Sequence, residues 1–475
     1  MKAHHLTLIA AAALLAGCGS LVPATDKIAP PLREDFRPTA TTTAAPANVA
    51  HEWDGFFADA RLRQVVGIAL AQNRTLRASA AAVERVRAQY RITEADRIPD
   101  LNAGMSATRQ QVAGGARSTS YAVNLGLASY EIDLFNRLGS LEGAALARYL
   151  AQQETQRSAQ LSLVAEVSSA WLTLAAEQQR LTLAQQLRDS QQRTLNLTEQ
   201  RYQLGAASGL ERARASTAFE AARGEATRAQ SAVTQARLAL ELLAGQPLPD
   251  TLLPLSQDLQ AVTALPAIPA GLPADVLLQR PDLRAAEQQL QAAAFDVGAA
   301  RAARFPRLTL TASAGTRSPE LDGLFKSGTG FWSVLPQLDL PLFDGGARAA
   351  QVEVSQASRR QALATYEGAL QAAFREAADA LAVRDGLAER LDAQQAQVAA
   401  AARALQIAED SYRLGSSSQL ELLDAQRQLA SAQQALVTLR QTEQANRVTL
   451  LRALGGRWTP AGAEPAGTPI AASQR

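Results

Sequence analysis

The chain has 475 residues, of which 47% are hydrophobic but only 5% aromatic, and alanine supplies much of the apolar content. This composition favours long helices packed closely side by side over a thick globular core. Lys+Arg (47) nearly balance Asp+Glu (45), so the chain lacks the positive excess that typifies nucleic-acid binding.

The N-terminus predicts secretion and a lipid anchor. An apolar run over Leu6–Ala16 is too short to span a bilayer, as in a signal peptide. It ends in Leu15-Ala16-Gly17-Cys18, which resembles a lipobox, where bacterial precursors are cleaved and the cysteine is acylated, palmitate being one such acyl group. We expect a signal peptide over residues 1–17 and a lipidated tether over 18–50. Gly19, standing where an aspartate would retain a lipoprotein at the inner membrane, favours sorting to the outer membrane.

The same N-terminus limits the chemistry of the mature chain. His4 and His5 leave with the signal peptide, so His51 and Cys18 are the histidine and cysteine that remain. A zinc site of Cys and His ligands and a catalytic Cys–His pair are therefore excluded, and no phosphate-binding loop or HExxH motif is present. We expect no enzyme activity, no metal, and no cofactor beyond the covalent lipid on Cys18.

Beyond the tether the predicted elements follow one another in a clear order. Helical periodicity over residues 51–97 ends at a proline. Period-two alternation then predicts a β-hairpin with strands over 101–108 and 121–127. A long helix with apolar residues at heptad spacing covers 140–203, and a return helix after a turn ends at Ala244.

The second half of the chain repeats this order. A helix opening at Leu272 is ended by Pro306, and a second hairpin is predicted with strands over 308–315 and 332–340. A second long helix reaches Tyr412, and its return helix ends at Gly455. We therefore divide the chain into a first structural repeat, a Pro-rich linker, a second repeat and a C-terminal tail, over residues 51–245, 246–273, 274–456 and 457–475.

Two turns of similar sequence anchor this duplication. Gly205 and Gly415 can adopt the left-handed conformation that ends a helix. Ser208 and Ser418 are each followed three residues later by a glutamate, which is the pattern of a capping box that restarts a helix. Both pairs are 210 positions apart (415 − 205 and 418 − 208). The chain is thus predicted to be a tandem duplication built around two antiparallel helical hairpins.

The two β-hairpins supply four strands, each close to the ~9–11 residues of a tilted membrane strand. A membrane sheet must close so that no edge faces lipid, and known barrels start at eight strands. If the strands span a membrane, the chain must oligomerise: a dimer would give eight strands and a trimer twelve, and the sequence does not choose. The alternative is a pair of soluble hairpins that pack on the helices.

With these elements in place, the chain resembles the TolC-family outer-membrane factors, in the lipoprotein branch that serves RND-type multidrug efflux pumps. The resemblance is carried by Trp53-Asp54-Gly55-Phe56-Phe57, LPADVLLQRPDLRAAE (272–287), PLFDGG (341–346), the paired turns and LLDAQR (422–427). It implies a mixed, mainly α fold: a homotrimer whose chains share one outer-membrane β-barrel, continuous with a long α-helical barrel. It also implies a passive duct that contacts a periplasmic adaptor (membrane fusion protein) and an inner-membrane RND pump.

The resemblance further implies a gate at the periplasmic tip of the second hairpin. Glu421 and Asp424 match the family's acidic constriction and lie three residues apart, on one helix face. Three chains would bring six carboxylates near one axis, which would favour cations and raise the pKa of some of these groups. Leu420 would form an apolar plug, and Arg427 and Tyr412 would hold the closed state by polar contacts between helices. The simpler interpretation of Tyr412, which matches Tyr202 in the first repeat, is a packing residue.

Each acidic residue also has a simpler interpretation. Glu421 completes a capping box, as Glu211 does in the first repeat. Asp424 could pair with Arg427 on a solvated helix, which is worth only ~0.2–0.5 kcal/mol. Because Arg214 stands in the first repeat where Asp424 stands in the second, the acid is peculiar to the second hairpin, and this favours Asp424 as the gate residue.

Two other functions fit parts of the pattern. A lipid-anchored periplasmic coiled-coil adaptor or scaffold without a pore would have similar helices, but it would not need apolar hairpins of membrane length. An exit duct for type I protein secretion would share the whole fold. The lipobox and the segment RPDLRAAE (280–287) favour drug efflux over protein secretion, by resemblance alone.

Overall fold

The computed structural model of the chain describes residues 21–24, 56–111, 117–255, 259 and 277–456. Their contacts define two compact units. The sheet unit contains residues 21–24 with Ala81–Thr155 and Asp282–Ala369, and the hairpin unit contains the remaining described residues. Each unit takes residues from both sequence repeats. Cys18, most of the predicted tether, much of the predicted linker and the tail over 457–475 lie outside the described residues.

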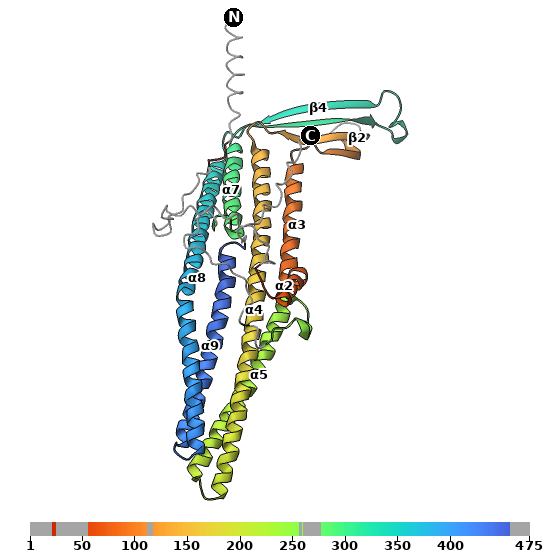
Figure 1. Cartoon of the computed structure of the whole chain (residues 1–475). Coiled ribbons are helices and arrows are strands. Elements are labelled where there is room, and N and C mark those ends of the chain that lie inside the picture. Colours follow the sequence, from red (N-terminus) through yellow and green to blue (C-terminus); the bar gives the residue numbers. More distant parts are fainter. Residues whose placement is uncertain (1–20, 25–55, 112–116, 256–258, 260–276, 457–475) are drawn as a thin grey trace. The chain divides into compact units, whose positions relative to one another are not determined.

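The sheet unit holds one antiparallel sheet of four strands in the order β1-β2-β3-β4 (Figure 1). Both predicted hairpins are confirmed: β1 (Leu101–Gln111) pairs with β2 (Arg117–Ile132), and β3 (Arg307–Ser318) pairs with β4 (Gly330–Asp339). The pairing of β2 with β3 joins the two repeats. In a single chain β1 and β4 are therefore edge strands with unpaired backbone groups.

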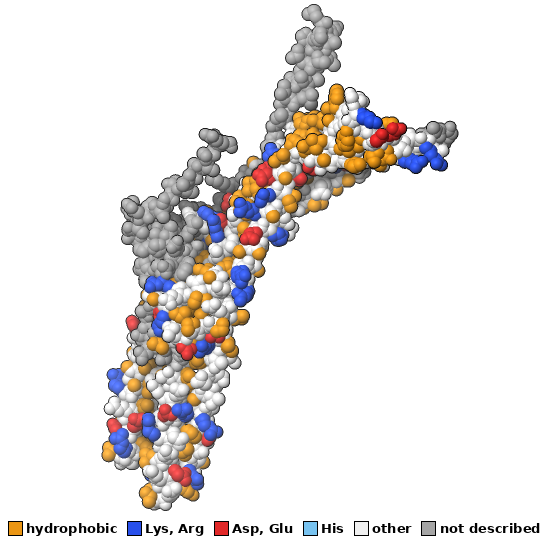
Figure 2. Space-filling model, turned by 90° about the vertical axis from the view of Figure 1, so that its right-hand side faces the viewer, with side chains coloured by type: hydrophobic (Ala, Val, Ile, Leu, Met, Phe, Trp, Pro, Cys, Tyr) orange, Lys and Arg blue, Asp and Glu red, His pale blue; other side chains and the backbone are white. Residues whose placement is uncertain are grey.

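The outer strands of this sheet are exposed to an unusual degree. All 11 residues of β1 are exposed, and β4 is nearly as open. The predicted apolar faces include Met105 and Trp332, which are 70% and 78% exposed, and Figure 2 shows hydrophobic side chains gathered over the strands. β1 and β4 thus do not pack on the helices of the chain, as the soluble alternative would require.

A β-bulge explains why the sequence places the end of β2 too early. The alternation of apolar residues stops at Leu127, where the predicted strand ends, yet β2 continues to Ile132. One extra residue lies between Leu127 and Tyr130 in the pairing with β3, and Ser129 has a left-handed φ of 51°. A bulge shifts the alternation by one residue, so the same face continues with Tyr130.

The N-terminal helical region is two helices rather than the single predicted one. α2 (Ala60–Gln72) and α3 (Arg74–Ala95) are separated at Asn73, whose backbone is extended with ψ 127°. The Asn73 side chain accepts a hydrogen bond from the N–H of Leu76 at 2.9 Å and donates one to the carbonyl of Leu243 at 2.9 Å. Capping by a short amide side chain therefore restarts the helix.

The first helical region of the second repeat is interrupted just before α7. α7 (Pro281–Ala302) opens with proline at its first position, where the missing N–H costs no hydrogen bond. The predicted start, Leu272, lies outside the described residues. Leu277 is helical, and a turn at Leu278 and Gln279 separates it from α7. The end of α7 before Pro306 is as predicted.

The long helices and their return helices are confirmed. α4 (Arg137–Gln203) and α8 (Ala347–Arg413) each have 67 residues, and α5 (Gly209–Ala244) and α9 (Gln419–Ala453) follow them after the predicted turns (Figure 1). Among the described helices, α4 is the one long and apolar enough to cross a membrane, but half of its apolar window is buried. Burial within the protein accounts for that apolar character.

The core of the hairpin unit is apolar and surrounds Trp171, which is fully buried on α4. The predicted heptad residues Val167 and Leu174 belong to this core. Part of the predicted Pro-rich linker belongs to it as well: Leu248 and Leu253, on either side of the 3-10 helix η3 (Asp250–Leu252), are buried. The described start of the linker is therefore packed structure, because its leucines find apolar partners despite its prolines.

Candidate channel gate at the helical turns

The two helical turns have the same backbone. Gly205 and Gly415 both adopt the left-handed conformation, with φ of 72° and 77°. One residue further on, the N–H of Ala206 donates to the Arg201 carbonyl at 2.7 Å, and the N–H of Ser416 donates to the Ser411 carbonyl at 2.9 Å. This six-to-one bond is the Schellman pattern that ends a helix. The role predicted for both glycines is confirmed in geometry.

Both capping boxes are also present. Ser208 and Ser418 each accept a bond from the N–H of the following glutamate, at 3.2 and 3.3 Å. Glu211 and Glu421 accept bonds in return from the serine N–H groups, at 2.6 and 3.0 Å. Each pair satisfies two backbone donors that a helix N-terminus would otherwise leave unpaired.

Hydrogen bonds from Ser417 and Ser418 favour the ionised form of Glu421 in the single chain. The hydroxyl of Ser417 and the N–H of Ser418 both donate to its carboxylate, and they hold the pKa of Glu421 below its ordinary value. A carboxylate that accepts such bonds is easier to ionise. The raised pKa expected of an acidic ring is thus not a property of Glu421 within one chain, and the simpler capping interpretation describes its contacts.

Asp424 and Arg427 form the predicted pair on one helix face. The two charged groups are 3.2 Å apart, and the amide of Gln428 also donates to Asp424 at 2.6 Å. The side chains of Asp424 and Arg427 remain 50% and 66% exposed, and Leu420 is exposed beside them. The acid, the arginine and the predicted apolar plug therefore all lie on accessible surface next to the second turn.

Tyr412 is placed differently from its repeat partner. Its ring is buried, and the guanidinium of Arg201, from the first hairpin, lies 5.1 Å from the ring centre. Its hydroxyl has no hydrogen-bond partner among the described residues. Within one chain Tyr412 therefore links the two hairpins by packing and by a cation–π contact with Arg201. Tyr202 is exposed and is covered by Arg212 of its own hairpin.

A buried polar seam joins α4 to α9 next to these turns, and sequence reasoning missed it. The amide of Gln191 donates to Gln426 at 2.9 Å, and Gln426 donates to the hydroxyl of Ser190 at 3.1 Å. Nearer the turn, Gln419 donates to Thr198 at 3.2 Å. Gln191 and Thr198, and likewise Gln419 and Gln426, are spaced by seven residues, so a heptad search that included polar residues would have found the seam.

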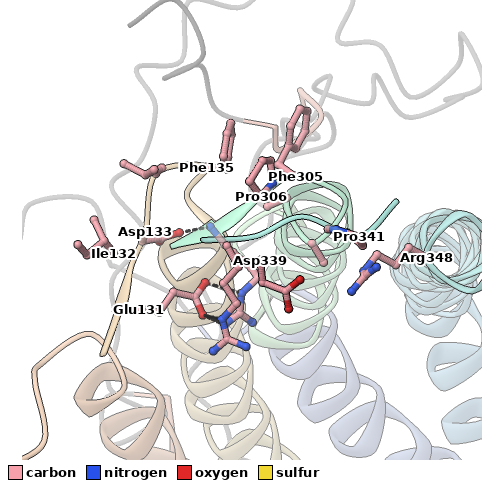
Figure 3. A pocket seen from close by; sticks show the side chains of 14 residues that line it. Glu131, Ile132, Asp133, Phe135, Phe305, Pro306, Asp339, Pro341 and Arg348 are labelled. Carbon is pink, nitrogen blue, oxygen red and sulfur yellow. Dashed lines mark hydrogen bonds and ion pairs between the residues drawn. The ribbon is translucent and has the colours of Figure 1, made fainter. Parts of the chain in front are cut away.

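A pocket of about 200 Å³ lies where the strands meet the helices in the sheet unit (Figure 3). Glu131, near the end of β2, pairs with Arg137 at 2.6 Å and with Arg307 at 2.5 Å. The rings of Phe135 and Phe305 stack with their centres 4.6 Å apart. The carboxylate of Asp133 caps the start of α4 by accepting two of its N–H bonds. These contacts hold the end of β2 and the start of β3 against the first turn of α4.

Comparison with known proteins matches this architecture to one family. Residues 65–246 and 272–456 match the family described as Outer membrane efflux protein, one match for each repeat. The chain belongs to this family. Its fold is accordingly that of the TolC-type channels, and its place is the outer membrane.

Individual relatives agree along nearly their whole length. Outer membrane protein OprJ of Pseudomonas aeruginosa is 41% identical, with 94% of each chain covered. Toluene efflux pump outer membrane protein TtgF of Pseudomonas putida is 40% identical over 98% of this chain and 99% of its own. Among solved structures, the open state of the Neisseria gonorrhoeae MtrE outer membrane channel matches with a TM-score of 0.83 and 36% identity, covering 92% of this chain and 98% of MtrE.

Proposed function

We propose that the chain forms the exit duct of a tripartite RND-type efflux pump, as a homotrimer. The observation that carries the proposal is the four-stranded sheet, which has two unpaired edges and outer strands left uncovered. Three copies would supply twelve strands (3 × 4), enough to close a membrane barrel and satisfy every edge. Lipid would then cover the apolar residues that are exposed in a single chain.

The duct is passive and works with two partners. A periplasmic adaptor and an inner-membrane pump of the RND type engage its periplasmic end, and the pump supplies the energy. Relatives carry names that refer to toluene, solvent and antibiotic efflux, which supports small apolar molecules as the transported class. The duct takes no catalytic part, binds no cofactor, and needs no nucleic acid.

The gate is proposed to lie at the second helical turn. Asp424 supplies the charge that the first hairpin lacks, Glu421 shapes the turn through its cap, and Leu420 adds an exposed apolar side chain. Arg427 holds Asp424, and Tyr412 ties the second hairpin to the first through Arg201. Opening would require the Tyr412 contact and the polar seam to rearrange, because both join the two hairpins.

The chain is further proposed to be a lipoprotein acylated on Cys18. The support is the lipobox-like Leu15-Ala16-Gly17-Cys18. Lipid anchoring is weaker than insertion of a membrane-spanning element, so the lipid would assist the barrel rather than replace it. Growth of cells with labelled palmitate tests this point, since replacement of Cys18 by serine should abolish incorporation.

The proposal is tested by complementation together with a mass measurement. The chain is expressed with its partner adaptor and pump in a strain that lacks its own efflux ducts, and native mass spectrometry gives its oligomeric state in detergent. Three copies and restored resistance to toluene and antibiotics are expected. Monomers that restore nothing would point to an anchored scaffold without a pore. Trimers that restore secretion of a protein but not resistance would point to a type I duct.

A further inference from the structure

Four residues that follow the predicted lipid site lie against two helices of the sheet unit. We call these residues, Leu21–Ala24, the strap. Arg301 of α7 donates a hydrogen bond to the carbonyl of Leu21 at 3.1 Å, and Arg359 of α8 donates one to the carbonyl of Ala24 at 3.1 Å. Both ends of the strap are therefore held by a charged donor, and such bonds are stronger than neutral ones.

Gly298 of α7 leaves room for the middle of the strap. A Cβ on Gly298 would lie 2.6 Å from Cγ2 of Val22, 3.1 Å from Oγ of Ser140 and 3.3 Å from Cα of Val22, so a larger residue would force the Val22 side chain or the strap to shift. Glycine inside a helix costs roughly 0.5–1 kcal/mol relative to alanine. Its small size lets both the strap and Ser140 of α4 approach α7 closely at this point. We call Gly298, Arg301 and Arg359 the notch.

The number of residues between the lipid site and the strap limits the distance between them. Leu21 follows Cys18 by three residues, and three extended residues reach at most ~11 Å. Arg301 is one residue from the end of α7, and β3 begins at Arg307. The docked strap therefore lies near the end of α7 that leads into β3.

The bases of the strands have the side chains expected at a membrane surface. Phe305 and Phe135 stack there and are partly exposed (Figure 3), and after β4 Leu342 and Phe343 are 88% and 93% exposed. Aromatic side chains concentrate at the boundary between lipid and water in membrane proteins. Two independent features, the docked strap and the aromatic side chains, thus lie toward the same end of the sheet.

We propose that the notch is a binding site for the chain's own strap, and that it holds the acylated Cys18 level with the strand bases. The acyl chains and the strands then enter the same lipid leaflet together, which lowers the entropic cost of inserting three separate sheets. This inference rests on the membrane sheet and the acylated Cys18 proposed above.

Docking of the strap is tested by a designed disulfide. The position of a Cβ on Gly298 relative to Val22 suits the short Cβ–Cβ separation of a disulfide, so Val22→Cys with Gly298→Cys should cross-link on mild oxidation. Mass spectrometry of peptides from outer-membrane protein locates the bond. Val22→Cys with Gly368→Cys is the control, because Gly368 of α8 has no atom within 4 Å of its Cβ position. Absence of the 22–298 bond in folded protein would overturn docking.

To test whether the strap positions the acylated Cys18, the notch is first weakened and the strap is then held by the disulfide. Arg301→Gln with Arg359→Gln should lower the yield of trimer in the outer membrane severalfold while palmitate incorporation is unchanged. Adding the 22–298 disulfide should restore the yield, and a reductant present during assembly should abolish the rescue. An unchanged yield, or a loss that the disulfide does not rescue, would show that the strap does not position the lipid. Failure of palmitate labelling would instead contradict the proposed acylation of Cys18, and it would not affect the evidence that the 22–298 disulfide gives for docking of the strap.

Discussion

The two helical turns share one backbone and differ in their charges and contacts. Gly205 and Gly415 end their helices in the same conformation, and both turns have a capping box. By contrast, Arg214 occupies the position of Asp424, and Tyr412 is buried against the first hairpin while Tyr202 is exposed. The duplication has kept what a tight turn needs. The residues that differ are therefore the ones to test for a role in gating.

The largest expected effect comes from the buried polar seam that the second return helix, α9, makes with α4. Gln426→Leu removes the partner of Gln191 and Ser190, and a buried amide left unpaired costs about 1–3 kcal/mol of unfolding free energy. Ser216, the exposed counterpart in the first repeat, is the matched control: Ser216→Ala should change stability by less than about 0.5 kcal/mol. Denaturant titration of the trimer in detergent measures both. Equal effects would show that the seam does not distinguish the hairpins.

The double variant sharpens this result. Gln191→Leu with Gln426→Leu removes both amides, so the pair should be markedly less destabilised than the sum of the two single variants. Strict additivity in the same titration would show that the two amides do not interact in the assembled protein.

The shared backbone predicts the next effect, which should be equal in both turns. Gly205→Ala and Gly415→Ala each force a Cβ into the left-handed conformation, at a cost of about 1–2 kcal/mol. Thermal unfolding monitored by circular dichroism should show similar shifts for the two variants. A clear difference between them would mean that assembly strains one turn and not the other.

The capping serines should have a smaller and again matched effect. Ser208→Ala and Ser418→Ala each remove one side of a capping box and should cost about 1 kcal/mol. The same unfolding assay applies, with Ser411→Ala as a control outside the box. An effect limited to one serine would contradict the equivalence of the two caps.

The smallest predicted effect is a pH dependence at the second cap. Bonds from Ser417 and Ser418 hold the pKa of Glu421 below the 4.5 of a free glutamate. The stabilisation that Glu421 gives is therefore complete above that value, and it is lost as the pH falls through the folded pKa. The stability difference between wild type and Glu421→Gln should shrink on acidification. Wild type that instead gains stability relative to Glu421→Gln on acidification would indicate carboxylates crowded together at the tip, with raised pKa values.

Much of the fold follows from local signals in the sequence. Prolines and glycines mark the ends of helices, and period-two alternation marks the strands, so both hairpins of each kind were predictable. Three features were not: the helix restart at Asn73, the bulge at Ser129 and the buried leucines of the linker. Each depends on a tertiary partner or on one residue that breaks a period.

The contacts of the candidate gate also divide into local ones, which the sequence predicts, and long-range ones, which it does not. The turns, the caps and the ion pair of Asp424 with Arg427 involve residues no more than five positions apart, and they were readable from the sequence. The contact of Arg201 with Tyr412 and the seam of Gln191 with Gln426 join residues more than 200 positions apart (412 − 201 = 211; 426 − 191 = 235). Periodicity can place such residues on a face, but it does not choose their partners.

Single-channel conductance of the purified protein in a planar bilayer tests the central claim most directly. Wild type should form cation-selective channels of low conductance, and Asp424→Ala should open them wider. The matched variant Arg214→Ala in the first turn should leave conductance unchanged. Glu421→Ala should increase conductance less than Asp424→Ala does. Equal conductance for wild type and Asp424→Ala would remove Asp424 from the gate, and folded protein that forms no channels would contradict the duct itself.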